Sequence, residues 1–191
     1  MKHHTFTRNG CRIIKGLIKT NKGKIFEEDF KNSVPEYALA YRLPDFAQSF
    51  GGGKNNLRFT IKNPFDYLLW DSERHILYAL ELKTVKGKSI SFERSKRDKG
   101  EIHFHQIEGL NKWSKYDGIV SGLIIEFREI ETTIFIDINS FNKLIGKVKK
   151  KSFNYSDLIE NEILFRIISQ RKKITRYTYD IDAFLRQTLV R

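Results

Sequence analysis

The sequence predicts a mixed α/β domain in which helices flank a central sheet. Segments with strand-like alternation occur between segments of helical periodicity along the whole chain. One segment, GIVSGLIIEF at 118–127, is almost continuously apolar, which is typical of a central strand covered on both faces. The 191 residues, of which 40% are hydrophobic and 30% charged, have the composition of a globular protein with one full core.

The first part of the chain contains one expected helix and four expected strands. Residues 1–22 are polar and basic, and we interpret them as an N-terminal arm before a single domain at 23–191. Phe26, Phe30 and Val34 recur every four residues, so they predict one helix face that ends near Pro35. Strands are expected at 37–43, 57–62, 65–70 and 76–83, with a Gly- and Asn-rich loop at 44–56 and a turn at 71–75.

The second part alternates helices and strands around the apolar segment. A polar, basic connection is expected at 84–102, followed by a helix at 103–116 whose apolar face includes Ile107 and Leu110. After the strand at 118–127 we expect a strand at 132–138, helices at 139–147 and 156–170, a short strand at 174–178 and a helix at 180–188.

The charge balance favours a polyanionic partner. The chain has 35 Lys and Arg residues against 23 Asp and Glu, a net charge of +12 and a pI near 9.7. Nucleic acid is the commonest partner of such a protein, and a basic surface without a partner is the alternative. No apolar run approaches the roughly 20 residues of a membrane span. The single Cys11 excludes an intrachain disulfide, which fits a reducing cytoplasm. We therefore expect a cytoplasmic protein, and the lack of a long apolar run leads us to expect no membrane attachment.

Two acidic residues and a lysine occupy the expected hairpin at 65–83. Asp66 begins its first strand, and Glu81 lies near the end of the second, so a tight turn would place them close together. Glu81 and Lys83 point to the same side because side chains two apart share a strand face. Two carboxylates can share a hard cation such as Mg²⁺, and Lys83 could hold an attacking water or neutralise a phosphate.

Two further residues could join this group from neighbouring helices. Glu27, one turn into the first helix, could reach the same metal, and Gln106, at the start of the helix at 103–116, could orient the water or the phosphate. Each residue also has a structural interpretation: Asp66 as a turn cap, Glu81 and Lys83 as a solvated pair, and Glu27 as an acid suited to its helix dipole.

The joint pattern, D-x14-E-x-K after an acidic helix, resembles the signature of the PD-(D/E)XK nucleases. Within that superfamily, the segments from 22 to about 145 resemble, in order, the RecU-type Holliday junction resolvases. KGKIFEEDF (22–30) is similar to their opening helix, and NPFDYLL (63–69) and ALELKT (79–84) are similar to their two motif strands. HFHQIEGL (103–110) is similar to the helix that follows, and YDGIVSGLIIEF (116–127) to the next strand.

This resemblance implies a restriction-endonuclease-like fold and a homodimer that resolves four-way DNA junctions by paired nicks in recombination and repair. It implies Mg²⁺ as the cofactor, with Mn²⁺ able to substitute. The sequence departs from the family pattern where Phe65, not Pro, precedes Asp66, and where the spacing from Asp66 to Glu81 is slightly longer. The residues that match the family's active-site positions are Glu27, Asp66, Glu81, Lys83 and Gln106, with Asp66, Glu81 and Glu27 as metal ligands.

Two basic segments are candidate DNA contacts. The resemblance implies a protruding stalk hairpin at about 43–62, whose cations would meet phosphates and whose aromatic rings would stack on exposed bases. A flexible hairpin tip without a DNA contact is the alternative. The connection at 84–100 is interpreted as a flap that contacts DNA, with a solvated loop as the alternative. The candidate DNA-binding residues are Lys54, Arg58, Lys62, Phe46 and Phe50 in the stalk, and Lys86, Lys88, Arg94, Lys96 and Arg97 in the connection.

Two other functions stay open. One is a different PD-(D/E)XK nuclease that acts on duplex or branched DNA, and the other is a non-catalytic DNA-binding protein whose acidic residues are structural. Catalysis requires Asp66, Glu81 and Lys83 to converge, whereas a purely architectural protein has no such requirement.

Overall fold

The structure is a computed structural model that describes residues 21–44, 46–49 and 57–187. Its centre is a sheet in which β5 and β7 are parallel neighbours and all other neighbouring strands are antiparallel. This arrangement confirms the predicted mixed central sheet. The spatial order of the strands is β1 (Ala38–Arg42), β4 (Tyr67–Asp71), β5 (Ile76–Val85), β7 (Ile119–Phe127), β8 (Thr132–Asp137) and β10 (Arg166–Ile168).

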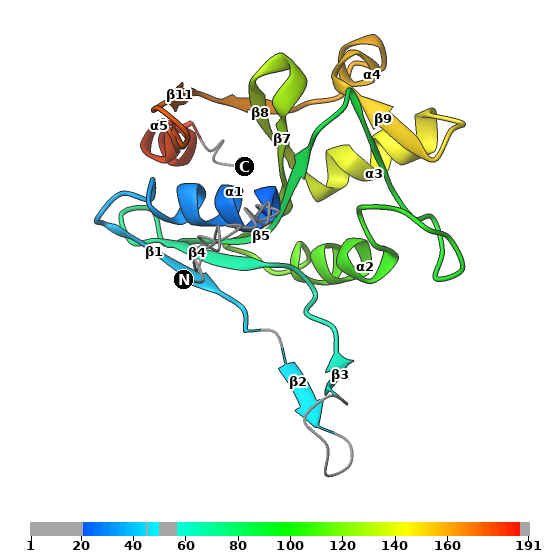
Figure 1. The fold of residues 1–191 in the computed structure, drawn as a ribbon, viewed down its shortest axis with the longest axis horizontal. Coiled ribbons are helices and arrows are strands. Elements are labelled where there is room, and N and C mark those ends of the chain that lie inside the picture. The colour runs from blue at the N-terminus through cyan, green and yellow to red at the C-terminus, as the bar shows by residue number, and fades with distance from the viewer. Residues whose placement is uncertain (1–20, 45, 50–56, 188–191) are drawn as a thin grey trace, which may run out of the picture.

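Helices cover both faces of the sheet, each over its own hydrophobic cluster (Figure 1). The first face is covered by α1 (Lys22–Lys31) and α5 (Ile181–Arg186), and the second by α2 (Phe104–Trp113), α3 (Ile138–Lys147) and α4 (Tyr155–Glu160). Among the described residues, no helix is long and apolar enough to cross a membrane.

Strand β5 is the element that distributes residues between the two faces. Its alternate residues Tyr78, Leu80 and Leu82 belong to the cluster under α1 and α5. Ala79 and Val85 belong to the cluster under α2 and α3. Because side chains alternate along a strand, Glu81 and Lys83 lie on the face covered by α2.

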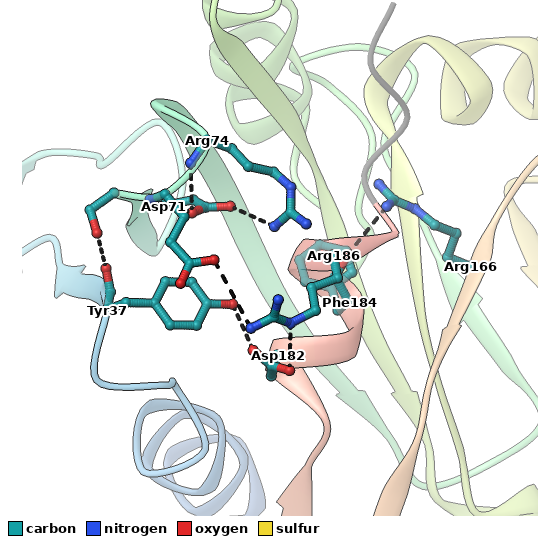
Figure 2. Close-up of polar contacts among 9 residues, drawn as sticks. Tyr37, Asp71, Arg74, Arg166, Asp182, Phe184 and Arg186 are labelled. Atoms are coloured by element: carbon teal, nitrogen blue, oxygen red, sulfur yellow. Dashed lines mark hydrogen bonds and ion pairs between the residues drawn. The ribbon is translucent and has the colours of Figure 1, made fainter.

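The C-terminal helix is attached to the turn end of the β4–β5 hairpin by a polar cluster (Figure 2). The Tyr37 hydroxyl donates to Asp182 Oδ1 at 2.8 Å, and Arg186 Nε donates to Asp182 Oδ2 at 2.9 Å. Asp71, which is fully buried, accepts from the backbone N–H groups of Glu73 and Arg74 and so caps the turn. Ser72 of the turn donates its hydroxyl to the Tyr37 carbonyl at 2.5 Å, so the cluster fixes the end of the hairpin that lies opposite Asp66 and Glu81.

Three small two-stranded sheets complete the described part of the fold. The first is the expected stalk, which projects from the body of the molecule in Figure 1. The second joins the basic connection to the segment after α3, and the third forms a hairpin before α5. Their strands are β2 (Phe46–Ser49) with β3 (Leu57–Ile61), β6 (Ser89–Ser91) with β9 (Ser152–Asn154), and β11 (Gln170–Lys172) with β12 (Tyr177–Tyr179).

Three sequence expectations are wrong in detail. Part of the expected loop at 44–56 is strand β2. The connection at 84–102 is anchored, because Ile90, Phe92 and Ile102 are buried in the core and β6 pairs with β9. The helix expected at 156–170 ends at Glu160, because the chain turns at Glu162 with a positive φ of 52° and continues as β10.

Candidate active site

Asp66 and Glu81 lie opposite each other at the open end of the β4–β5 hairpin. Tyr67 pairs with Leu80 in the strand register, and the Asp66 N–H donates to the Leu80 carbonyl at 3.1 Å. The Leu82 N–H donates to Asp66 Oδ2 at 3.0 Å, so the backbone of β5 fixes the Asp66 carboxylate. The sequence prediction that both acids lie at the same end of neighbouring strands is thus the geometry observed.

Glu81 is the buried centre of the group, with only 1% of the residue exposed. Its Oε1 atom lies 2.8 Å from Lys83 Nζ and accepts a hydrogen bond from Gln106 Nε2 at 2.5 Å. Its Oε2 atom is buried without a hydrogen-bond partner among the described residues. The structure therefore brings together four of the predicted residues: Asp66, Glu81, Lys83 and Gln106.

The charge of Asp66 raises the cost of ionising Glu81, whereas the contact with Glu81 favours the ionised form of Asp66. Burial, together with the nearby charge of Asp66, raises the pKa of Glu81 to about 8. Burial also raises the pKa of Asp66, although the Leu82 N–H and the Lys83 charge oppose this rise. Burial is the main cause of both raised pKa values, and the positive charge of Lys83 offsets only part of each rise.

Helix α2 holds Gln106 in a defined orientation. Gln106 is the third residue of the helix, and its Oε1 atom accepts from the His103 N–H at 2.8 Å. Because the oxygen is used in this way, the amide NH₂ group points to Glu81. A glutamine at this helix position can accept from the backbone and also donate to the Glu81 carboxylate. An ionised acidic residue has no donor for the second contact.

Glu27 approaches the group from the other face of the sheet. Its Oε2 atom accepts from Arg42 Nε at 2.6 Å, at the end of β1. The Glu27 charge also contributes to the raised pKa of Asp66, so the two acids are neighbours. Within the described ranges, no group of three or more His, Cys, Asp or Glu residues is arranged to hold a metal ion. The role of Glu27 as a metal ligand stays a prediction.

The donors of this group suit a hard divalent cation. Mg²⁺ prefers oxygen ligands and is commonly held by one or two carboxylates while it keeps several waters. Glu81 Oε2 is a buried oxygen that lacks a donor among the described residues, and Asp66 provides a second carboxylate beside it. The fit with Mg²⁺ rests on this unsatisfied oxygen and on the acidic character of both side chains.

Only part of the predicted DNA-binding set can be placed. Lys62 is exposed at the base of the stalk and lies near enough to His105 of α2 to contribute to the lowered pKa of that imidazole, whose main cause is burial. Lys86, Lys88, Lys96 and Arg97 are exposed, and Lys88 Nζ lies 3.6 Å from Glu129. Lys54 and Phe50 lie outside the described residues, as do the side chains of Phe46 and Arg58.

Arg94 has a structural role that the sequence did not predict. Its guanidinium donates to the carbonyl oxygens of Ile145, Val148 and Lys150 at and after the end of α3. It also lies over the Phe92 ring, with its Cζ atom 5.3 Å from the ring centroid. Since its donors are used to attach the basic connection to α3, we remove Arg94 from the candidate DNA contacts.

Sequence reasoning also missed Glu93, which attaches the basic connection to the helix that carries Gln106. Glu93 Oε2 accepts from the Phe104 N–H at 2.8 Å, and Oε1 lies 2.9 Å from His103 Nδ1. The pairing joins residues ten and eleven positions apart across a loop, so no local sequence pattern predicts it.

The fold and the site define a mixed α/β domain with two acids, a lysine and a glutamine gathered at one end of the central strands. The chain belongs to the family of the SPbeta prophage-derived uncharacterized protein YotM of Bacillus subtilis (strain 168). The two sequences are 30% identical over 171 residues, which cover 83% of this chain and 82% of YotM.

Two further comparisons concern family models and solved structures. No protein-family model matches the chain. Among solved structures, it is similar to Hjc, a Holliday junction resolvase from the archaeal hyperthermophile Archaeoglobus fulgidus. The TM-score is 0.44 and the identity 15%, with 71% of this chain and 90% of Hjc covered.

Proposed function

We propose that this protein is a Mg²⁺-dependent endodeoxyribonuclease that resolves four-way DNA junctions. The observation that supports the enzymatic part is the convergence of Asp66, Glu81 and Lys83, with a buried Glu81 oxygen that lacks a partner among the described residues. A buried polar atom without a partner costs about 1–3 kcal/mol. A bound cation would offset that cost directly.

The residues would divide the chemistry among them. Asp66 and Glu81 would hold Mg²⁺, with Glu27 within reach as a further ligand. When bound, Mg²⁺ neutralises charge on the scissile phosphate and lowers the pKa of a bound water. Lys83, 2.8 Å from Glu81, would hold the attacking water or stabilise the negative charge that develops on the phosphate. Gln106 would keep the Glu81 carboxylate in position through its amide.

The preference for a junction is the finer part of the proposal, and it rests on the RecU-like motifs and the stalk. The β2–β3 hairpin projects from the body of the molecule, as an element that enters the open centre of a junction would (Figure 1). A homodimer would bring two metal sites to opposite strands, which matches the two-fold symmetry of a four-way junction. The net charge of +12 would supply the phosphate contacts.

A nuclease for duplex or other branched DNA is the second candidate, because the same acids and lysine would serve it equally. A non-catalytic DNA-binding protein has less support. Burial raises the pKa of both Asp66 and Glu81, which is an arrangement that active sites use and that a DNA-binding surface does not need.

The deciding experiment is a nicking assay on a synthetic four-way junction beside a linear duplex of matched sequence, with Mg²⁺ or with a chelator. Paired nicks in the junction that require Mg²⁺ are the expected result. Asp66→Asn and Glu81→Gln should each reduce cleavage by roughly 100-fold or more, since metal ligation needs the carboxylate charge. Binding to the junction should persist because affinity comes mostly from Lys and Arg.

A matched control is Glu108→Gln, which removes an exposed carboxylate from the same helix as Gln106. It should cut like the wild-type protein. Near wild-type cleavage by Asp66→Asn or Glu81→Gln would show that the metal assignment is wrong. Equal cleavage of junction and duplex would favour the general nuclease.

A further inference from the structure

Two buried side-chain atoms have no hydrogen-bond partner among the described residues, and they are of opposite kind. One is the acceptor Glu81 Oε2, in the candidate active site, and the other is the donor Arg128 Nε. Arg128 begins a short 3₁₀ helix, Arg128–Ile130, directly after β7. By the same reasoning that assigns a cation to Glu81, the buried N–H of Arg128 calls for an acceptor.

Arg128 lines a cavity of about 200 Å³ between α1, the end of β7 and the β11–β12 hairpin. Lys22 from α1 and Lys172 from β11 contribute two further cations to its wall, and Lys172 Nζ also lies 3.2 Å from Glu131 Oε1. Two acids also line it, Asp29 from α1 and Glu126 from β7. Whether the cavity suits an anion therefore depends on how those acids are used.

Both acids are already engaged by other groups. Asp29 accepts from Arg176 Nε at 2.5 Å and from the Tyr177 N–H at 3.0 Å. Glu126 accepts from the hydroxyl of Tyr179 at 3.0 Å and from that of Thr84 at 2.5 Å. Each carboxylate oxygen thus has a donor of its own, whereas the guanidinium Nε of Arg128 lacks an acceptor among the described residues.

We propose that this cavity binds a phosphate group of the DNA backbone. A guanidinium with neighbouring ammonium groups is the donor set that recognises phosphate. The cavity volume of about 200 Å³ is several times the roughly 30 Å³ that one water molecule occupies in the liquid, so the cavity has room for a phosphate group. The exposed cations Arg171 and Lys173 precede and follow Lys172 in the chain and add positive charge to this hairpin, which favours a polyanion over a free phosphate ion.

The position of the cavity relates it to the candidate active site. Thr84 of β5 contacts Glu126 at the cavity, while its neighbour Lys83 contacts Glu81 on the other face of the same strand. The two sites therefore lie on opposite faces of the sheet near the same end of β5. A duplex lying across that end of the sheet could touch both, so the cavity would anchor one DNA arm while the metal site acts on another phosphate. This role rests on the proposed function for the identity of the polyanion.

The test is DNA binding by Arg128→Met, measured in a chelator as a function of salt with the labelled junction and duplex. Loss of one phosphate contact should lower the slope of log affinity against log salt by about 0.9 and weaken binding several-fold at low salt. The control Lys115→Met removes an exposed cation just before the amino end of β7, far along the strand from Arg128, and should leave the slope unchanged. An unchanged slope and affinity for Arg128→Met would overturn the proposal.

A second variant and a second probe separate the other outcomes. Lys172→Met alters an exposed side chain of the hairpin, so it tests the same cavity if Arg128→Met fails to fold, and its DNA affinity should also fall. Inorganic phosphate that raises the melting temperature of the wild-type protein, with DNA affinity independent of Arg128 and Lys172, would identify a free-phosphate site and overturn the DNA assignment. Binding is measured without Mg²⁺, so it can be tested apart from cleavage. If the slope depends on Arg128 but the protein never cleaves DNA, the phosphate site stands and only the nuclease proposal is contradicted.

Discussion

Gly109 of α2 and Pro64 are in direct contact: a Cβ atom on Gly109 would lie 2.5 Å from the Cβ of Pro64 and 2.6 Å from its carbonyl oxygen. The helix that carries Gln106 therefore rests on the segment that leads into Asp66. Only a residue without a side chain permits this approach. The contact sets the distance between Gln106 and the two carboxylates.

We predict that Gly109→Ala weakens both the fold and the site. The added methyl group meets backbone atoms of Pro64, so α2 or the segment before Asp66 must shift, at a cost of about 1–3 kcal/mol. A shift of this kind would also reduce cleavage, since small displacements of positioned groups slow a reaction strongly. Urea unfolding and the nicking assay measure the two effects.

The control for this substitution is Gly146→Ala in α3. A Cβ atom at Gly146 would meet nothing within 4 Å, so alanine should stabilise the helix by up to about 1 kcal/mol. If Gly109→Ala were as stable and as active as Gly146→Ala, the contact with Pro64 would not position the site.

A second prediction concerns the stability of the Glu81→Gln variant, which can be measured without a cleavage assay. The amide keeps an oxygen for Lys83 and Gln106 and replaces the unsatisfied Oε2 by a donor beside Asp66. In a chelator, the variant should therefore be more stable than the wild type by about 1 kcal/mol. Mg²⁺ at 100 times its dissociation constant should stabilise the wild type by about 2.7 kcal/mol and the variant much less. Thermal unfolding that responds to Mg²⁺ equally in both proteins would contradict the metal site.

Much of the site could be predicted because it depends on strand alternation and on a single hairpin register. Asp66, Glu81 and Lys83 belong to two neighbouring strands, and period two alone places Glu81 and Lys83 on one face. The buried strand β7 could be predicted equally well, since a continuous apolar run between turn signals is typical of a strand covered on both faces.

The missed features depend on contacts between distant segments. Arg94 reaches the carbonyl groups after α3, more than fifty residues along the chain, and in the sequence it looks like one more cation of a basic loop. The apolar residues of 156–170 suit a helix, but Ile167 and Ile168 pair with β8 at the sheet edge after the turn at Glu162. Tertiary pairing overrides a local pattern of this kind.

Glu93 gives a prediction about pH. Burial alone would raise the pKa of Glu93, but hydrogen bonds from the Phe104 N–H and from His103 outweigh it and lower the pKa. A lowered folded-state pKa means that the stabilisation is complete above the unfolded value of about 4.3 and is lost as the pH falls through the folded value. Glu93→Gln should cost about 1 kcal/mol at pH 7, as loss of a helix cap does.

The difference between wild type and Glu93→Gln should therefore shrink in urea titrations carried out below about pH 4. Glu108→Gln, on the exposed side of the same helix, serves as the control and should show no such pH-dependent difference. A difference that stays constant from pH 7 down to acid pH would exclude the proposed pairing with α2.

Lys83→Ala tests the chemical step apart from metal binding. Lys83 contacts Glu81 Oε1 but is not a ligand, so Mg²⁺ should still stabilise the variant against heat. Cleavage should fall by about 100-fold or more if the ammonium group stabilises charge in the transition state. Lys115→Ala, an exposed lysine before β7, should cut normally. Unchanged turnover in Lys83→Ala would remove Lys83 from the mechanism.

The last prediction concerns the stalk, which separates a junction enzyme from a general nuclease. The β2–β3 hairpin forms a sheet of its own, and Asn63 Nδ2 closes its base by donating to the Pro44 carbonyl at 3.0 Å. Replacing residues 46–59 by a short Gly-Ser turn keeps this closure and leaves Asp66, Glu81 and Lys83 in place. The body should remain folded and Mg²⁺ should still stabilise it, because the central sheet and the helices on its two faces supply the described hydrophobic clusters.

Cleavage of the four-way junction should then fall far more than cleavage of the matched duplex, because only the junction offers an open centre that a projecting element can fill. The hairpin cations would also be lost, so junction affinity should depend less steeply on salt. A shortened protein with wild-type thermal stability that still resolves junctions, and still prefers them over duplex, would show that 46–59 is only a loop. In that outcome junction selectivity would have to come from the body of the protein, and the general nuclease would become the better description.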